Sequence, residues 1–145
     1  MQLTLIKNNA DAKDTLYKLA RIIYAETRAS SLPAVEALAS MIGNIRTKSM
    51  RQLSDIAADE SVFESLDKKS PRNEDLLINS DDPKFQMCLR VVKRMSIGQL
   101  QDNIRGAVRF HRDDCLPEWA TGIGAIAEID GLLFYRDEEK VRSKI

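Results

Sequence analysis

Apolar residues recur at helical spacing in three stretches of the chain. In 16–28 and 35–45 they stand three or four positions apart, which places them on one face of a helix. Pro33 precedes the second stretch and suits a first helical turn, where its missing N–H would have no partner. Asp82 is expected to cap a third helix, which ends near Gly98. The pattern therefore predicts a helical first two thirds.

The start and the middle of the chain carry weaker signals. Residues 1–10 are expected to form a short strand or an N-terminal arm, with Asp11 or Asp14 capping the first helix. The segment 49–82 is long and polar, above all in its stretch 61–82, and Phe63 is its one aromatic residue. Such a segment is typical of a functional lid, although a mobile excursion is the alternative.

The last third changes to strand patterning. Apolar and polar residues alternate in 106–111, and two apolar runs, 125–129 and 132–135, flank the turn pair Asp130-Gly131. Helices followed by a small antiparallel sheet indicate an α+β fold that is predominantly helical. The length of 145 residues indicates one domain, 1–145, with 137–145 as a solvated, charged tail.

Composition excludes several classes of function. Lys and Arg together number 22, as do Asp and Glu, so no net charge favours nucleic acid or an anionic membrane. No apolar run approaches the ~18 residues of a membrane span, and no secretory signal is visible. We therefore expect synthesis in the cytoplasm. Cys88 and Cys115 form no metal motif and are expected to be reduced, structural thiols; neither a metal nor a cofactor is predicted.

Glu26 is the first candidate for chemistry. It follows the apolar stripe of the first helix and falls close to the same face. A carboxyl group buried there holds its proton more readily, which suits a general acid. The alternative is structural: Glu26 reaches water at the helix end and pairs with Arg28 or another arginine.

Aromatic and polar side chains in the last third form a second candidate group. Flat faces with hydrogen-bonding tips stack on sugar rings, which makes a glycan cleft one interpretation. The residues are Phe110, His111, Trp119, Phe134 and Tyr135. Core packing of Trp119 and a structural hydrogen bond of His111 are the alternatives. Asn44 interrupts an apolar helix face, and it either fixes helix packing or holds the substrate or the acid.

Five blocks in order carry a resemblance to a known family. They are ARIIYAETR, SMIGNIR, GAVRFH, PEWA and IDGLLFYR, spread from about Leu16 to Arg136. Together they resemble the bacterial cell-wall hydrolase family that includes the spore cortex-lytic enzymes. The segment VFES is similar to that family's Gln-Phe-Ser block only at Phe63 and Ser65.

The resemblance implies a lysozyme-like or lytic transglycosylase-like fold and a peptidoglycan substrate. Glu26 falls on the family's catalytic acid, which implies cleavage between N-acetylmuramic acid and N-acetylglucosamine with one Glu as acid and base. Asn44, His111, Trp119 and Tyr135 are then expected to position the glycan. If water were the nucleophile, a second carboxylate would be needed. The candidates are Asp113, Asp114 and Asp130, each also typical of a turn.

The chain departs from the family's pattern at several polar positions. Leu132 stands where the family has a His near its final Phe-Tyr, and Val108-Arg109 replaces a Thr-His. One alternative is therefore a catalytically degenerate module that binds glycan or protein on the same fold. A second is a helical interaction protein with no cleft beside Glu26. Action at the wall would need release by a non-classical or phage lysis route.

Overall fold

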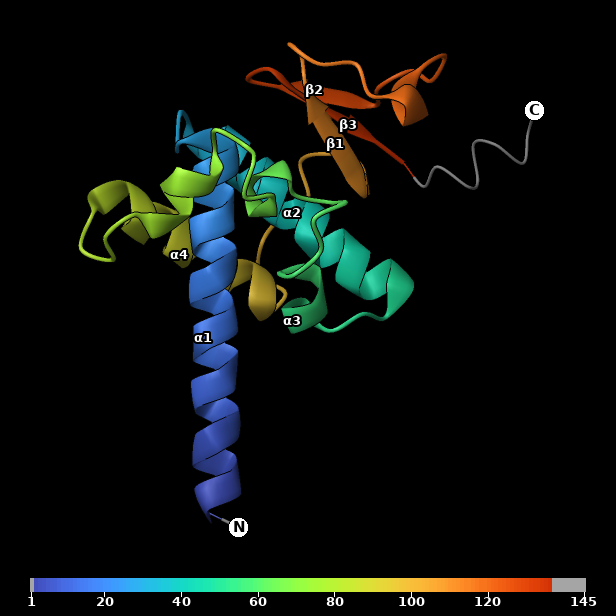
Figure 1. Ribbon diagram of the computed structural model, residues 1–145. Helices are drawn as coiled ribbons and strands as arrows, with labels where there is room; N and C mark the ends of the chain where they lie inside the picture. Colours follow the sequence, from blue (N-terminus) through green and yellow to red (C-terminus); the bar gives the residue numbers. More distant parts are fainter. Residues whose placement is uncertain (1, 137–145) are drawn as a thin grey trace.

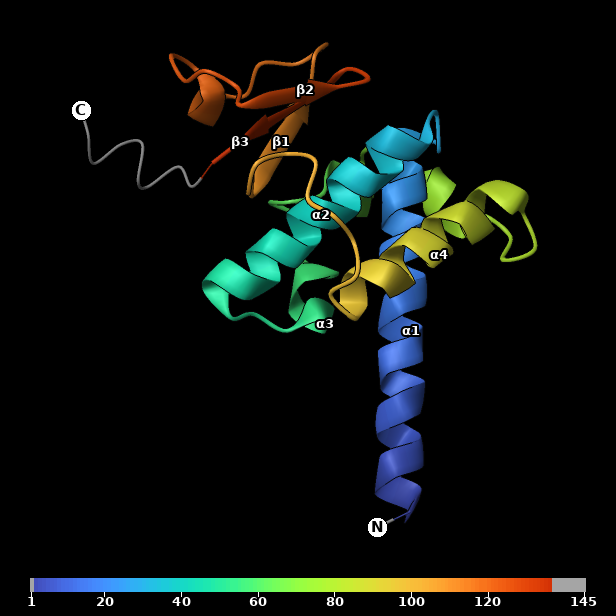
Figure 2. The same ribbon diagram turned by 180° about the vertical axis from the view of Figure 1, so that it is seen from behind.

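The computed structural model describes the backbone of residues 2–136 and the side chains of residues 14–136. Its helical part is built from α1 (Gln2–Thr27), α2 (Leu32–Ser49), the short α3 (Leu53–Ile56) and α4 (Pro83–Ser96). α1 packs against both α2 and α4, as Figures 1 and 2 show from opposite sides. The expectation for 137–145 lies outside the described residues.

The three strands form one antiparallel sheet at one end of the helices. β1 (Arg109–Arg112), β2 (Ala127–Ile129) and β3 (Leu132–Tyr135) lie in the order β1-β3-β2. Asp130 and Gly131 connect β2 to β3 with φ angles of 54° and 84°, the conformation of a two-residue hairpin turn. The predicted α+β class and small antiparallel sheet are therefore confirmed.

Local side chains set the ends of α2 and α4; Pro33, Asp82 and Gly98 stand where the sequence predicts, and Ser31 is an additional cap. The Ser31 hydroxyl accepts a hydrogen bond from the Ala34 amide at 3.2 Å, at the start of α2. The Asp82 carboxylate accepts one from the Lys84 amide at 2.8 Å, at the start of α4. Gly98 follows the end of α4 with a φ of 74°.

The start of α1 corrects one expectation. The helix begins at Gln2, so residues 2–10 belong to it and form neither a strand nor an irregular arm. Asp11 and Asp14 therefore lie within the helix rather than at its start. Asp14 pairs with Lys18 one turn later, with 3.4 Å between Oδ2 and Nζ. The helical phase in this stretch is weak, which is why the sequence did not reveal it.

The first strand begins later than predicted. Arg105 and Gly106 have φ angles of 57° and 80°, so the chain still turns where alternation suggested strand. The Asp102 carboxylate stabilises this turn by accepting hydrogen bonds from the amides of Ile104, at 2.8 Å, and Gly106, at 2.7 Å. The strand that pairs with β3 therefore begins only at Arg109.

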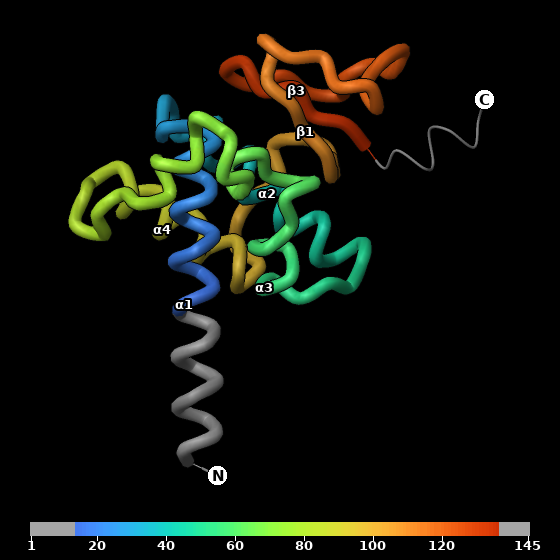
Figure 3. Tube along the Cα trace, in the orientation of Figure 1, coloured from blue at the N-terminus to red at the C-terminus, as the bar shows by residue number. Residues whose placement is uncertain are grey.

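The polar segment 57–82 packs on the helices through two short 3-10 helices. These are η1 (Glu64–Leu66) and η2 (Asn73–Leu77), and both contact α1, beside which Figure 3 traces the segment. Phe63 is fully buried in the core that α1, α2 and α4 share. Burial of one large aromatic side chain anchors this otherwise polar stretch. The segment therefore packs on the helices, and its function as a lid stays a prediction.

The two cysteines differ in environment. Cys88 lies in the core on α4, as its spacing predicts, whereas Cys115 is exposed, so the expectation of a structural role is wrong for it. Both thiols are free. Burial raises the pKa of the Cys88 thiol to about 12, which removes the reactive thiolate at neutral pH.

We expect one thiol to react with a disulfide reagent in the native protein and the other only after unfolding. The thiolate is the nucleophile, so exposed Cys115 should react within the mixing period, and buried Cys88 should follow the unfolding rate. Titration with and without denaturant measures this, and Cys115→Ser should abolish the fast phase. Two fast thiols in the native protein would contradict the buried position of Cys88.

Candidate active site

Glu26 lies in the last turn of α1 and is completely covered. The residue is 1% exposed, and its side chain is 0% exposed. The helix ends one residue later because Arg28 and Ala29 both adopt left-handed conformations, with φ angles of 54° and 52°. This conformation costs a residue other than glycine about 1–2 kcal/mol. The chain therefore turns sharply beside the carboxylate.

Two donors hold the Glu26 carboxylate from outside its own helix. Arg112 on β1 donates from Nη1 to Oε1 at 2.6 Å, and the same nitrogen lies 3.2 Å from the Glu26 carbonyl oxygen. The backbone N–H of Ser65, in η1, donates to Oε2 at 2.8 Å. Charge-assisted bonds of this kind stabilise a negative charge. Glu26 thus pairs with an arginine, as the structural alternative held, but it does not reach water.

Arg112 binds a second carboxylate at the same time. Its Nη2 donates to Glu64 Oε1 at 3.1 Å, and Glu64 Oε2 accepts from the Ser70 hydroxyl at 2.7 Å. Burial by itself lowers the pKa of Arg112, but its bonds to Glu26 and Glu64 outweigh that effect and raise it. The guanidinium therefore bridges two acids, one buried and one whose side chain is 52% exposed.

Ser65 completes the surroundings of Glu26. Its carbonyl oxygen accepts from Asn73 Nδ2 at 2.9 Å, which fixes η1 against η2. Its hydroxyl oxygen is buried and has no hydrogen-bond partner.

A polar pocket of about 390 Å³ adjoins Glu26 between the end of α1 and the sheet. Arg28 pairs there with Asp75 at 3.1 Å, and Arg72 donates to the Ala25 carbonyl at 3.3 Å. The pocket is lined by Glu26, Thr27, Arg28, Ser30, Ala34, Arg72, Arg112, Asp113, Asp114, Asp130, Gly131 and Leu132. All three candidates for a second carboxylate line this pocket.

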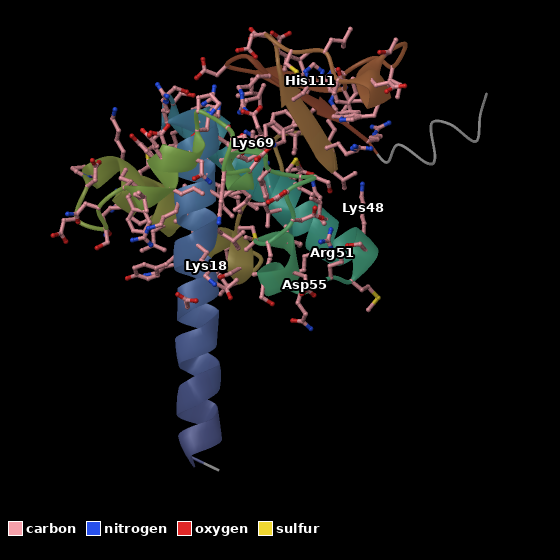
Figure 4. The ribbon with its side chains drawn as sticks, viewed as in Figure 1. Lys18, Lys48, Arg51, Asp55, Lys69 and His111 are labelled. Atoms are coloured by element: carbon pink, nitrogen blue, oxygen red, sulfur yellow. The ribbon has the colours of Figure 1, made fainter. Side chains whose placement is uncertain are left out.

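Three of the predicted glycan-binding residues lie together on the other face of the sheet. His111 Nε2 is 2.7 Å from the Tyr135 hydroxyl, and the Trp119 ring packs edge-on against both rings. Neighbouring residues in a strand point to opposite faces, so His111 points away from the side where Arg112 reaches Glu26. Figure 4 shows His111 among the side chains of the sheet. Their role as glycan contacts stays a prediction.

The fourth, Asn44, lies in neither place. Its Nδ2 donates to the Ala107 carbonyl at 3.0 Å and to Asp102 Oδ2 at 3.3 Å. These bonds tie α2 to the turn before β1, which agrees with a role in packing. Sequence reasoning missed Arg112 and Glu64 because nothing local links them to Glu26. For Ser65, the partial match at VFES was the one available signal.

Comparisons with known proteins assign no family. No family model matches the chain, nor does any curated protein or solved structure. Among residues 2–136, no helix is long and apolar enough to cross a membrane. Among the side chains of residues 14–136, no group of three or more His, Cys, Asp or Glu could hold a metal ion.

Replacing Arg112 by Ala is expected to lower the free energy of unfolding by about 3–5 kcal/mol, because it leaves a buried carboxylate without its partner. Arg28→Ala is the matched control. Its pair with Asp75 is largely exposed, with 62% of the Arg28 side chain accessible, so that loss should stay below about 1 kcal/mol. Urea unfolding measures both, and equal losses would contradict the special burial of the Glu26 pair.

Proposed function

We propose that the protein cleaves peptidoglycan glycan strands between N-acetylmuramic acid and N-acetylglucosamine, with Glu26 as the single acid and base. The observation that carries the proposal is the position of Glu26: a buried carboxylate at a helix end, beside a polar pocket between helices and sheet. The resemblance of ARIIYAETR and the blocks that follow it agrees with this position. The proposal includes a lysozyme-like arrangement of the helices and sheet.

The pocket suits a sugar chemically. Sugar hydroxyl groups need both donors and acceptors, and this pocket offers guanidinium groups, carboxylates and small hydroxyl side chains. Its volume of about 390 Å³ falls in the range of small-ligand sites. The strained backbone at Arg28 and Ala29 lies at its edge, and such strain gathers at functional sites.

The reaction needs one carboxyl group that changes role. Protonated Glu26 gives its proton to the bridging oxygen as the bond from that oxygen to C1 of the muramic ring breaks. The carboxylate then takes the proton of the C6 hydroxyl group while its oxygen bonds to C1. The products are a free hydroxyl on the leaving sugar and a 1,6-anhydro end, and Glu26 returns to its protonated form.

Water is the alternative nucleophile, and it would need a second carboxylate to activate it. Asp113, Asp114 and Asp130 line the same pocket as Glu26. Asp130 already accepts from the Ser30 hydroxyl at 2.7 Å, which favours a structural role for it. Asp113 and Asp114 are therefore the better candidates if the products carry reducing ends.

A second candidate function is a module that binds glycan without cutting it. The specific observation in its favour is the ion pair between Glu26 and Arg112, because a charged, covered carboxylate has no proton to donate. Such a module would use the same pocket and would keep its affinity for the wall when Glu26 is replaced.

Digestion of purified peptidoglycan is the test. The wild type should release anhydro-muropeptides, detected by mass spectrometry, and Glu26→Gln should release none, because Gln cannot transfer the proton. Glu36→Gln is the matched control: Glu36 pairs with Arg94 at 3.0 Å and does not line the pocket, so its activity should match the wild type.

Products with reducing ends instead of anhydro ends would show that the reaction is hydrolysis and not the transglycosylase reaction. No release by the wild type across several wall types and pH values would contradict cleavage altogether. Retention on insoluble walls, measured on the same samples, would then favour the binding module.

A further inference from the structure

Arg112 binds the proposed acid, Glu26, in a way that opposes proton donation. Its bond to Glu26 Oε1, at 2.6 Å, stabilises the charged carboxylate, and it helps to reduce the exposure of that side chain to 0%. A general acid must instead be protonated and within reach of the substrate. Some change at Arg112 is therefore required before Glu26 can act.

Arg112 already has a second acidic partner, Glu64. Glu64 already binds its Nη2 at 3.1 Å and is oriented by the Ser70 hydroxyl at 2.7 Å. The hydrogen bond from Ser70, with the charge of Arg112 adding to it, holds the pKa of Glu64 below its usual value. Glu64 thus remains a charged partner for the guanidinium when Glu26 takes up a proton.

We propose that Arg112 is a positioning residue shared by Glu26 and Glu64, and that its movement toward Glu64 uncovers Glu26 and allows it to be protonated. The inference rests on the proposed function in so far as it concerns cleavage. Protonation removes the charged partner of Nη1 and leaves this nitrogen only the longer bond to the Glu26 carbonyl oxygen, at 3.2 Å, whereas the bond from Nη2 to charged Glu64 survives.

Other charged groups also act on Glu26 and define the controls. Arg72, the residue before η2, interacts with Glu26 electrostatically, and burial together with Arg112 and Arg28 lowers the pKa of Arg72. The carboxylates lining the same pocket are Asp113, Asp114 and Asp130. Arg28→Gln removes a pocket charge without touching a Glu26 contact, so it separates general electrostatics from the specific bond.

The ionisation of Glu26 can be followed without any activity. The Ser65 amide donates to Glu26 Oε2 at 2.8 Å, so its proton chemical shift reports the charge on that carboxylate. The quantity compared is the pH at the midpoint of the Ser65 amide shift. Removing Arg112 takes away a neighbouring positive charge, so this midpoint should lie higher in Arg112→Gln than in the wild type. Glu64→Gln leaves Arg112 bound to Glu26 alone, so its midpoint should lie lower than in the wild type.

The experiment measures two quantities in the wild type, Arg112→Gln, Glu64→Gln and Arg28→Gln. The first is the pH midpoint of the Ser65 amide shift, and the second is the pH at which the cleavage rate falls on the alkaline side. Opposite shifts in the first two variants, followed by the alkaline limb, and a smaller shift in Arg28→Gln, support the proposal. A purely structural pair would change stability without moving the alkaline limb. Shifts of the same sign, or no shift in Glu64→Gln, overturn the proposal whether or not the protein cleaves.

Two outcomes keep the two claims separate. Opposite shifts of the amide midpoint in Arg112→Gln and Glu64→Gln, without cleavage by the wild type, would overturn the proposed function and support the sharing of Arg112.

If Arg112→Gln does not fold, Arg112→Lys takes its place. Lysine retains the charge but offers one nitrogen, which cannot bridge both acids as the guanidinium does. When Arg112→Lys is already present, adding Glu64→Gln should leave the pH midpoint of the Ser65 amide shift unchanged. If Glu64→Gln moved that midpoint as far as it does in the protein with Arg112, the bridging role would be contradicted.

Discussion

The buried ion pair between Glu26 and Arg112 is the interaction on which the arrangement of the molecule depends. The two residues are 86 positions apart in sequence, yet 2.6 Å separates their charged atoms. Removing two charges from water is costly, and a buried pair is often no more stable than an apolar replacement. A gain in stability is therefore a weak explanation for this buried pair. Its position beside a pocket agrees better with the proposed function.

The same pair joins the three parts of the chain. Glu26 lies in the last turn of α1, Arg112 ends β1, and Ser65 and Glu64 belong to the segment that packs over them. Phe63 anchors that segment in the core two residues before Ser65. The aromatic group on the far face of the sheet, around His111, fixes β1 and β3 to each other through the Tyr135 hydroxyl. Packing on both faces thus holds Arg112 in place.

Local chemistry explains what the sequence could predict. The hairpin follows from Asp130-Gly131, and the starts of α2 and α4 follow from Ser31 and Asp82, because each signal acts over a few residues. The partner of Glu26 could not be predicted, since pairing across the fold leaves no periodic trace. His111 was grouped with Glu26 because the register of β1 was unknown; in that strand Arg112 faces Glu26 and His111 faces away.

The central claim is that the pocket beside Glu26 is where the glycan binds. Chemical shift mapping with a soluble peptidoglycan disaccharide, on Glu26→Gln to prevent cleavage, tests it most directly. The account predicts concentration-dependent shifts at the amides of Ser65, Asp113 and Gly131, which lie at or beside the pocket. Shifts confined to Trp119 and the outer face of the sheet, or no shifts at all, would contradict it.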